Sequence, residues 1–101
     1  MAEVSIGKAD LAPGKLRCIS AGGKKLTLAN IGGKYHCLQN ECTHAGGPMC
    51  EGSIDEKDGI VCPWHKSVFG AKDGKVLHGP AIDPLKTYKV SEKKGELYIS
   101  I

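Results

Sequence analysis

The sequence CTHAGGP at residues 42–48 and the sequence CPWHKSVFG at residues 62–70 decide how this chain is interpreted. Each stretch carries one cysteine and one histidine. One residue separates Cys42 from His44, and two residues separate Cys62 from His65. Thiolates and imidazoles are both common ligands of iron and zinc. The two stretches therefore predict one metal centre that is assembled from two loops.

Several kinds of site use these donors. A [2Fe–2S] cluster with unlike irons would take two sulfurs at one iron and two imidazoles at the other. A structural zinc site also takes two Cys and two His, but zinc modules usually bring a close cysteine pair and a close histidine pair. A catalytic Cys–His couple leaves the second pair unexplained, and chance burial of Cys and His remains the plainest option. The mixed pairs favour the iron–sulfur cluster, with zinc as the main alternative.

The remaining cysteines do not predict a disulfide framework. Five cysteines is an odd count, and nothing in the sequence indicates secretion. Cys18 lies in a short apolar stretch and Cys37 in an alternating segment, so we predict both to be small core residues. Cys50 lies close to the first loop and receives no assigned role. His36 and His78 lack a second nearby ligand, and we assign them no metal role.

Length and composition indicate one small domain, residues 1–101. A chain of this size has one core and no room for a second catalytic module, so we expect no enzyme active site. Fourteen Gly and five Pro, with few long apolar periodic runs, predict many turns and short strands rather than helices.

The charge pattern gives no indication of a nucleic-acid or membrane partner. The net charge of +3 comes from scattered side chains, without a basic run that is interleaved with aromatic residues. No segment has the length and apolar character of a membrane span, and we expect a cytoplasmic protein. An acidic stretch predicts a solvated connection between the two loops rather than a docking patch; its members are Glu51, Asp55, Glu56 and Asp58.

Alternating residues and turn signals predict a series of β-hairpins. Gly32 and Gly33 form a two-residue turn signal between two strand-like segments. The second Cys–His pair falls at the turn of another hairpin, and a terminal hairpin places Leu97, Ile99 and Ile101 on one face. The expected strands cover residues 24–31, 34–39, 59–61, 67–69, 75–77, 87–91 and 96–101.

Together with GGP at residues 46–48 and GPA at residues 79–81, the two motifs resemble the Rieske family of iron–sulfur proteins over roughly residues 30–90. The resemblance implies an all-β Rieske fold, an antiparallel sheet sandwich with a small cluster-binding subdomain at about residues 40–82 that is made of two hairpin loops. It also implies the ligands: Cys42 and Cys62 bind the inner iron, and His44 and His65 bind the outer iron close to solvent.

The same resemblance bears on the reduction potential. Two thiolates leave the oxidised centre neutral, so it accepts an electron more easily than a four-thiolate centre, at about −150 to +300 mV rather than about −400 mV. High-potential relatives have a disulfide between the loops, where this chain has Gly47 and Trp64. Ser67 keeps one hydroxyl donor of those relatives, but Phe69 lacks the other. We therefore expect a potential in the lower half of the range.

In function the chain is similar to the Rieske-type ferredoxins of multicomponent, ring-hydroxylating oxygenase systems. The resemblance implies a carrier that accepts one electron from a flavin-containing, NAD(P)H-dependent reductase and delivers it to a terminal oxygenase by transient docking. Met49, Trp64 and Pro80 are expected to form an apolar rim or to pack under the loops, with Pro80 shielding the cluster. The alternatives are a Rieske-like small subunit of a nitrite reductase and, from another class, a zinc-stabilised binding module.

Overall fold

The computed structural model describes residues 3–55 and 59–100, and nearly all the regular structure of these residues is β-strand. The strands are β1 (Glu3–Lys8), β2 (Lys15–Ala21), β3 (Lys24–Ile31), β4 (Lys34–Gln39), β5 (Ser53–Ile54), β6 (Gly59–Val61), β7 (Val68–Gly70), β8 (Val76–His78), β9 (Thr87–Tyr88), β10 (Val90–Lys93) and β11 (Glu96–Ser100). One short 3-10 helix, η1 (Met49–Glu51), follows the first Cys–His loop. The prediction of an all-β protein is confirmed.

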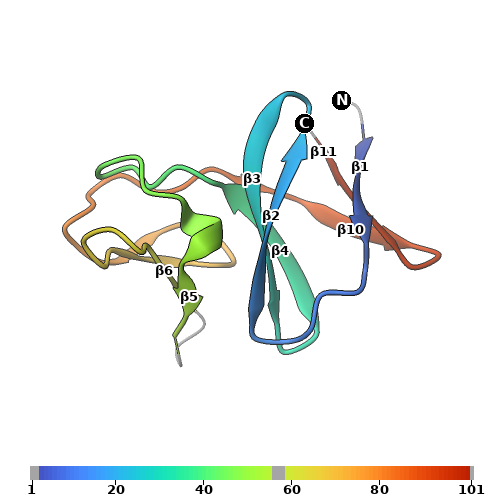
Figure 1. Cartoon of the computed structure of the whole chain (residues 1–101), viewed down its shortest axis with the longest axis horizontal. Coiled ribbons are helices and arrows are strands. Elements are labelled where there is room, and N and C mark those ends of the chain that lie inside the picture. The colour runs from blue at the N-terminus through green and yellow to red at the C-terminus, as the bar shows by residue number, and fades with distance from the viewer. Residues whose placement is uncertain (1–2, 56–58, 101) are drawn as a thin grey trace.

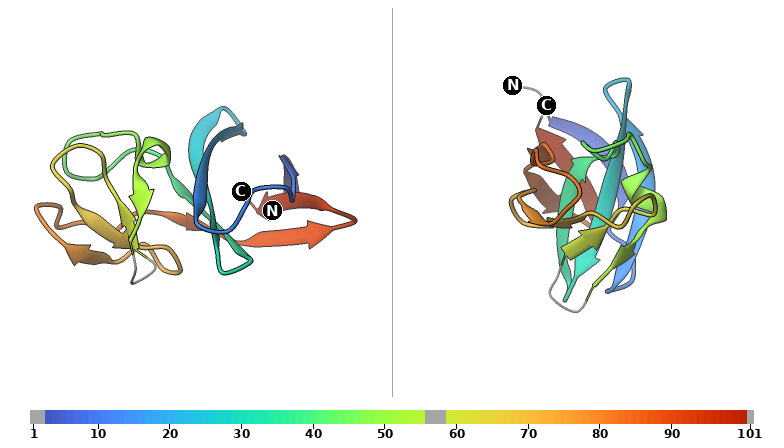
Figure 2. Two further views of the ribbon diagram at one scale, coloured as in Figure 1. Left: turned by 60° about the horizontal axis from the view of Figure 1, so that its bottom comes forward. Right: turned by 90° about the vertical axis from the view of Figure 1, so that its left-hand side faces the viewer.

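Three antiparallel sheets make up the described fold. Their strand orders are β1-β11-β10, β2-β3-β4-β9 and β5-β6-β7-β8. The sheet β5–β8 and the loops beside it occupy one end of the elongated molecule, and the other two sheets occupy the rest (Figure 1). The views in Figure 2 show the same separation from two further directions. No helix among the described residues is long and apolar enough to span a membrane.

The sheet β2-β3-β4-β9 is the central layer because apolar side chains lie on both of its faces. Residues 26–30 of β3 are all buried. Leu26 and Leu28 pack with Leu97 and Ile99 of β11, whereas Ala29 packs with residues of the β5–β8 end. Successive residues of a strand point to opposite faces, so one strand contributes to two separate cores, and the expectation of a single core is wrong. The metal loops are thereby packed onto the central sheet.

The predicted hairpins are found with one exception. β3 and β4 pair around Gly32 and Gly33, and β6 and β7 pair around the second Cys–His motif. The strand expected at residues 87–91 is divided: β9 pairs with β4, and β10 pairs with β11. Lys89 separates these two short strands, so one segment supplies an edge strand to each of two sheets. Leu97 and Ile99 are buried as expected, whereas Ile101 lies outside the described residues.

Two strands near the N-terminus, β1 and β2, were not anticipated from the sequence. β1 pairs with β11, with a register shift between Ser5 and Gly7 where Gly7 has φ of 111°. β2 is an edge strand that pairs along its whole length with β3. Their pairing partners are distant or follow a turn, and their local alternation is weak, with most residues exposed or half-buried.

Candidate metal centre

The two Cys–His loops are closed by equivalent backbone hydrogen bonds. The N–H of Cys42 donates to the carbonyl of Gly47 over 2.9 Å, and the N–H of Cys62 donates to the carbonyl of Ser67 over 2.8 Å. Each cysteine therefore begins a tight loop that returns to it five residues later. This shared geometry gives both pairs the same local frame.

The structure brings the four predicted ligands together as two unlike pairs. Cys42 and Cys62 are buried, with exposed fractions of 3% and 0%, and their side chains are within hydrogen-bonding reach of each other. His44 and His65 are exposed, with ring centroids 5.0 Å apart and planes at 80°. Sulfur donors thus lie inside and nitrogen donors outside. The arrangement suits a centre with two metal atoms, each held by one pair.

The environment of Cys62 disfavours a free thiolate. Burial raises the pKa of the Cys62 thiol, and a hydrogen bond from the Trp64 backbone opposes this shift. The side chain of Cys42 raises the pKa further, first through a hydrogen bond between the two side chains and second through repulsion between two thiolates. Cys42 and Cys62 would hold iron as thiolates, and its positive charge would offset the cost of two buried thiolates. The residues therefore fit a [2Fe–2S] cluster.

Among the described residues, no three Cys, His, Asp or Glu side chains are arranged to hold a single metal ion. The four predicted ligands lie as one sulfur pair and one nitrogen pair. A structural zinc ion takes four ligands at one point, whereas each iron of the cluster takes two protein ligands and shares the sulfides.

The backbone of the second loop is held in an unusual conformation. His65 and Lys66 have φ of 61° and 62°, in the left-handed region that residues with side chains seldom adopt. Such a conformation costs roughly 1–3 kcal/mol per residue and persists only where the surrounding structure enforces it. Here it turns the chain sharply after Trp64 and places the ring of His65 beside that of His44.

Gly47 and Trp64, where high-potential relatives have a disulfide, lie against each other. A Cβ added at Gly47 would be 2.8 Å from Sγ of Cys62 and 3.0 Å from Cγ of Trp64. Glycine is therefore required by space, since nothing larger fits between the loops without movement. In this chain the contact of Trp64 with Gly47 takes the place of a covalent link between the loops.

A third loop, residues 79–85, is bound to both ligand loops. The hydroxyl of Thr43 donates to the carbonyl of Asp83 over 2.6 Å, and the N–H of Ala81 donates to the buried hydroxyl oxygen of Ser67 over 3.0 Å. Ser67 thus accepts one hydrogen bond and keeps its own proton to donate. Pro80 follows a cis peptide bond in this loop. Its role as a shield, like the donor role of Ser67, stays a prediction.

The expected apolar rim is only partly correct. Met49 is fully buried in the core beside Cys42 and Cys62, so it belongs to the packing under the loops and not to a rim. Trp64 is 51% exposed, and Pro80 is exposed as well. Ile82 in the third loop and Leu77 in β8 are also large, exposed and apolar, at 88% and 56%, and sequence reasoning missed both.

The expectations for Cys18 and for disulfides are wrong. Cys18 is exposed on β2 and forms a disulfide with Cys50 of η1. Its strand partner Thr27 lies on the same face of the central sheet, and η1 packs over that face. The odd count did not exclude a pair, because two of the five cysteines are the predicted ligands. Cys37 is buried as predicted, and burial raises the pKa of its thiol to about 12.

The acidic stretch is only partly described. Glu51 is exposed at the end of η1, and Oδ1 of Asp55 accepts a hydrogen bond from the N–H of Gly59 at the start of β6. Glu56 and Asp58 lie outside the described residues. The role of this stretch as a solvated connection stays a prediction.

Comparisons with known proteins agree with this geometry. A family model of the Rieske [2Fe-2S] domain matches residues 3–89. The 3-phenylpropionate/cinnamic acid dioxygenase ferredoxin subunit of Shigella flexneri serotype 5b (strain 8401) is 36% identical over 76 residues, which are 75% of this chain and 72% of that protein. The chain therefore belongs to the Rieske [2Fe-2S] family.

Solved structures show the same fold. A chain in the complex of reduced oxygenase and oxidized ferredoxin in carbazole 1,9a-dioxygenase matches with a TM-score of 0.88 at 30% identity, covering 95% of this chain and 99% of that one. A putative nitrite reductase NADPH small subunit matches with a TM-score of 0.82 over the full length of both chains, but its 20% identity shows the fold alone.

These findings confirm the predictions of function, cofactor, non-catalytic role and fold. The protein is a Rieske-type one-electron carrier with a [2Fe–2S] cluster, and it resembles the ferredoxin subunits of dioxygenase systems rather than their catalytic components. The fold is the Rieske fold.

Proposed function

We propose that Cys42 and Cys62 hold the inner iron of the [2Fe–2S] cluster, that His44 and His65 hold the outer iron, and that the protein delivers electrons to a terminal oxygenase. The observation that carries the proposal is the sorting of the ligands by burial, sulfurs inside and imidazole rings exposed side by side. When bound, the cluster supplies reversible one-electron redox chemistry. The residues of this chain position it and control its access to solvent.

The exposed rings mark the face through which electrons enter and leave. His44 and His65 lie on the two ligand loops. Trp64, the neighbour of His65, is exposed, and so is Ile82 on the third loop, which is bonded to the first. Apolar side chains around a polar centre exclude water when a partner docks transiently. The curated relative is a ferredoxin subunit of a dioxygenase, and the solved relative forms a complex with an oxygenase. This supports a terminal oxygenase as acceptor. The flavin-dependent reductase that the resemblance implies is proposed as the donor.

The proposal includes three further points. The chain acts as a single domain with its cluster-binding part at about residues 40–82, it works in the cytoplasm, and its potential lies in the lower half of the Rieske range, about −150 to +300 mV. Phe69 supports the low potential, since it is fully buried beside the cluster cysteines and has no hydroxyl to donate. The Gly47–Trp64 contact supports it too, since the loops lack the bracing disulfide of high-potential relatives.

The decisive experiment is spectroscopy of anaerobically purified protein. We expect about two irons and two sulfides per chain and the electron paramagnetic resonance spectrum of a mixed Cys–His cluster. His44→Ala and His65→Ala should each abolish that spectrum, whereas His78→Ala, which removes an exposed histidine of β8, should keep it. Retention of the spectrum after either loop substitution would remove that histidine from the ligand set. A colourless protein with one zinc would overturn the proposal.

The partners are tested by electron delivery. Purified reductase and oxygenase encoded beside this chain should turn over substrate only when the chain is added, and voltammetry should give a potential near or below zero. Stimulation of a nitrite reductase instead would favour the alternative small-subunit role, and a potential well above zero would contradict the low-potential assignment.

A further inference from the structure

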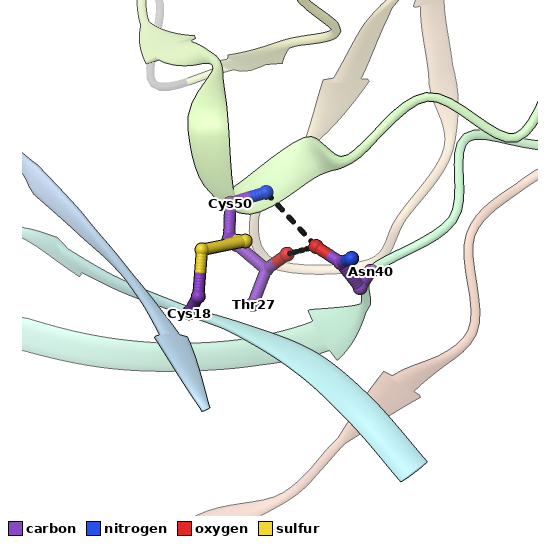
Figure 3. Close-up of a disulfide and its surroundings, with 4 residues drawn as sticks. All are labelled: Cys18, Thr27, Asn40 and Cys50. Carbon is purple, nitrogen blue, oxygen red and sulfur yellow. Dashed lines mark hydrogen bonds between the residues drawn. A yellow bond between two sulfur atoms is a disulfide. The ribbon is translucent and has the colours of Figure 1, made fainter. Parts of the chain in front are cut away.

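The Cys18–Cys50 disulfide is the covalent link between the central sheet and the base of the first ligand loop. It joins β2 to η1, and its two cysteines are 32 residues apart in the sequence. Figure 3 shows the bond between their sulfur atoms. η1 begins directly after Pro48, where the loop that carries Cys42 and His44 ends. The position of the disulfide therefore bears on how firmly that loop is held.

A buried amide couples the disulfide to the ligand loop. Oδ1 of Asn40 accepts hydrogen bonds from the hydroxyl of Thr27 and from the N–H of Cys50, each over 3.1 Å (Figure 3). The backbone carbonyl of Asn40 accepts the N–H of Met49 over 2.8 Å. Asn40 precedes Cys42 by two residues. Displacement of Cys50 would therefore disturb the hydrogen bonds that fix both ends of the loop.

The disulfide is accessible to a reductant. Cys18 is exposed, Cys50 is half-buried, and both line a surface pocket with a volume of about 280 Å³. Lys25 and Glu51 line the same pocket, so it presents one cation and one anion. Accessible disulfides exchange with thiols more readily than buried ones, and in a reducing compartment such a pair is usually transient or redox-sensing.

We propose that Cys18–Cys50 is a thiol–disulfide exchange site, that a dithiol reductant opens it, and that opening loosens the first ligand loop and speeds loss of the cluster. The effect on the cluster rests on the function proposed above. The Cys18–Cys50 disulfide is not the loop-to-loop disulfide of high-potential relatives, which would lie at the positions of Gly47 and Trp64. The link runs instead from the central sheet to the loop's base.

The exchange balances without any further reactant. A thiolate of the reductant attacks one sulfur, the Cys18–Cys50 bond breaks, and the released cysteine leaves as a thiolate that takes a proton. The second thiol of the reductant then attacks the mixed disulfide and releases the other cysteine. The reductant loses two electrons and becomes a disulfide, and the protein gains two electrons and two protons as two thiols.

The exchange itself is tested by peptide mapping of the holoprotein. Non-reducing digestion should yield a cross-linked peptide pair that contains Cys18 and Cys50. After anaerobic incubation of the folded protein with dithiothreitol, alkylation should label both cysteines, while buried Cys37 stays unlabelled. Absence of the cross-link before treatment, or its persistence afterwards, would overturn the proposal.

The consequence is tested by the rate of cluster release to an iron chelator, followed by visible absorbance. Dithiothreitol should raise this rate about ten-fold in the wild type, which corresponds to about 1.4 kcal/mol less activation free energy for release. The double variant C18S/C50S should release its cluster at the faster rate with or without dithiothreitol, and C37A should respond like the wild type. Equal rates in treated and untreated wild type would refute the link to the loop.

The two proposals fail in different ways. If the chain holds no iron, the function proposed above fails, but peptide mapping still decides the exchange site. Hydrogen exchange at residues 42–50 then replaces cluster release as the measure of loosening: faster exchange after reduction supports the coupling, and unchanged exchange overturns it.

Discussion

At the scale of single residues, burial divides the two kinds of predicted ligand. Cys42 and Cys62 sit in the core with Met49 and Phe69, where solvent and oxidants reach the sulfurs poorly. His44 and His65 lie outside with their rings in contact. Electron transfer between proteins is fastest across a short gap, and this supports the proposal that a partner approaches the exposed rings.

Gly47 gives the sharpest prediction at this scale. In Gly47→Ala the new Cβ would lie 2.8 Å from Sγ of Cys62, so a predicted ligand has to move. We expect the free energy of unfolding to fall by about 1–3 kcal/mol, as overpacking generally costs, and the visible spectrum of the cluster to shift. Denaturant unfolding and absorbance measure the two effects.

Gly79→Ala is the control for this substitution. A Cβ added at Gly79 has its nearest neighbours at 3.8 and 3.9 Å, an ordinary contact distance. Its stability and spectrum should stay close to those of the wild type. Equal losses in both variants would mean that the crowding at Gly47 is not what constrains the loops.

At the scale of elements, each ligand loop is held where strands end. The second loop joins the paired strands β6 and β7, whereas the first runs from β4 to η1 and has no strand partner of its own. Asn40 supplies the missing anchor, since its side chain and carbonyl bind both Cys50 and Met49. A buried amide and a disulfide thus hold the base of the first loop, while Thr43 ties its tip to the third loop.

We predict that Asn40→Ala destabilises the protein by about 1–3 kcal/mol, the cost of leaving buried donors without a partner. The hydroxyl of Thr27 and the N–H of Cys50 both lose their acceptor. The amide proton of Cys50 should exchange faster with solvent, as hydrogen exchange by mass spectrometry would show.

The neighbouring Gln39→Ala serves as the matched control. Its amide also makes two hydrogen bonds to backbone, to Glu41 and Lys86, but both are exposed. Water replaces such partners, so the loss should be smaller, at most about 1 kcal/mol. An equally large loss in Gln39→Ala would show that burial of Asn40 is not the reason for its importance.

At the scale of the whole molecule, the central sheet connects the metal end to the basal end. β4 places Leu38 in the core of the metal end. It places Cys37 in the basal core, which lies between the central sheet and the sheet β1-β11-β10. The two cores therefore share strands, and loss of packing in one weakens the support of the other. A substitution that destabilises the basal core should therefore also speed loss of the cluster.

Cys37 makes the stability of this core depend on pH. Burial raises the pKa of its thiol from 9.0 to about 12, so between these values the unfolded chain loses a proton that the native protein keeps. The unfolded state is favoured as pH rises through this window. Within this window the free energy of unfolding falls by up to about 1.4 kcal/mol for each pH unit, and below pH 9 the Cys37 thiol causes no pH dependence.

The measurement compares denaturant unfolding of the wild type and Cys37→Ala at pH 8, 9, 10 and 11. Both proteins should lose stability at high pH through other groups, but the wild type should lose it more steeply above pH 9. Parallel curves for the two proteins would show that the Cys37 thiol does not contribute.

The sequence was sufficient wherever local chemistry decides the structure. The spacing of Cys42, His44, Cys62 and His65 predicted the two loops, and Gly32-Gly33 predicted the turn between β3 and β4. Ligand type and turn formation depend on residues a few positions apart. Both patterns can therefore be read without knowledge of the rest of the chain.

Only the tertiary structure decided which distant segments meet. It separated β9 from β10, paired β1 with β11, buried Met49, and joined Cys18 to Cys50. Each of these depends on long-range packing that weak local alternation does not encode, because the same short strand can pair with several others. The sequence thus determined the chemistry of the centre, and the packing of three sheets determined how the centre is held.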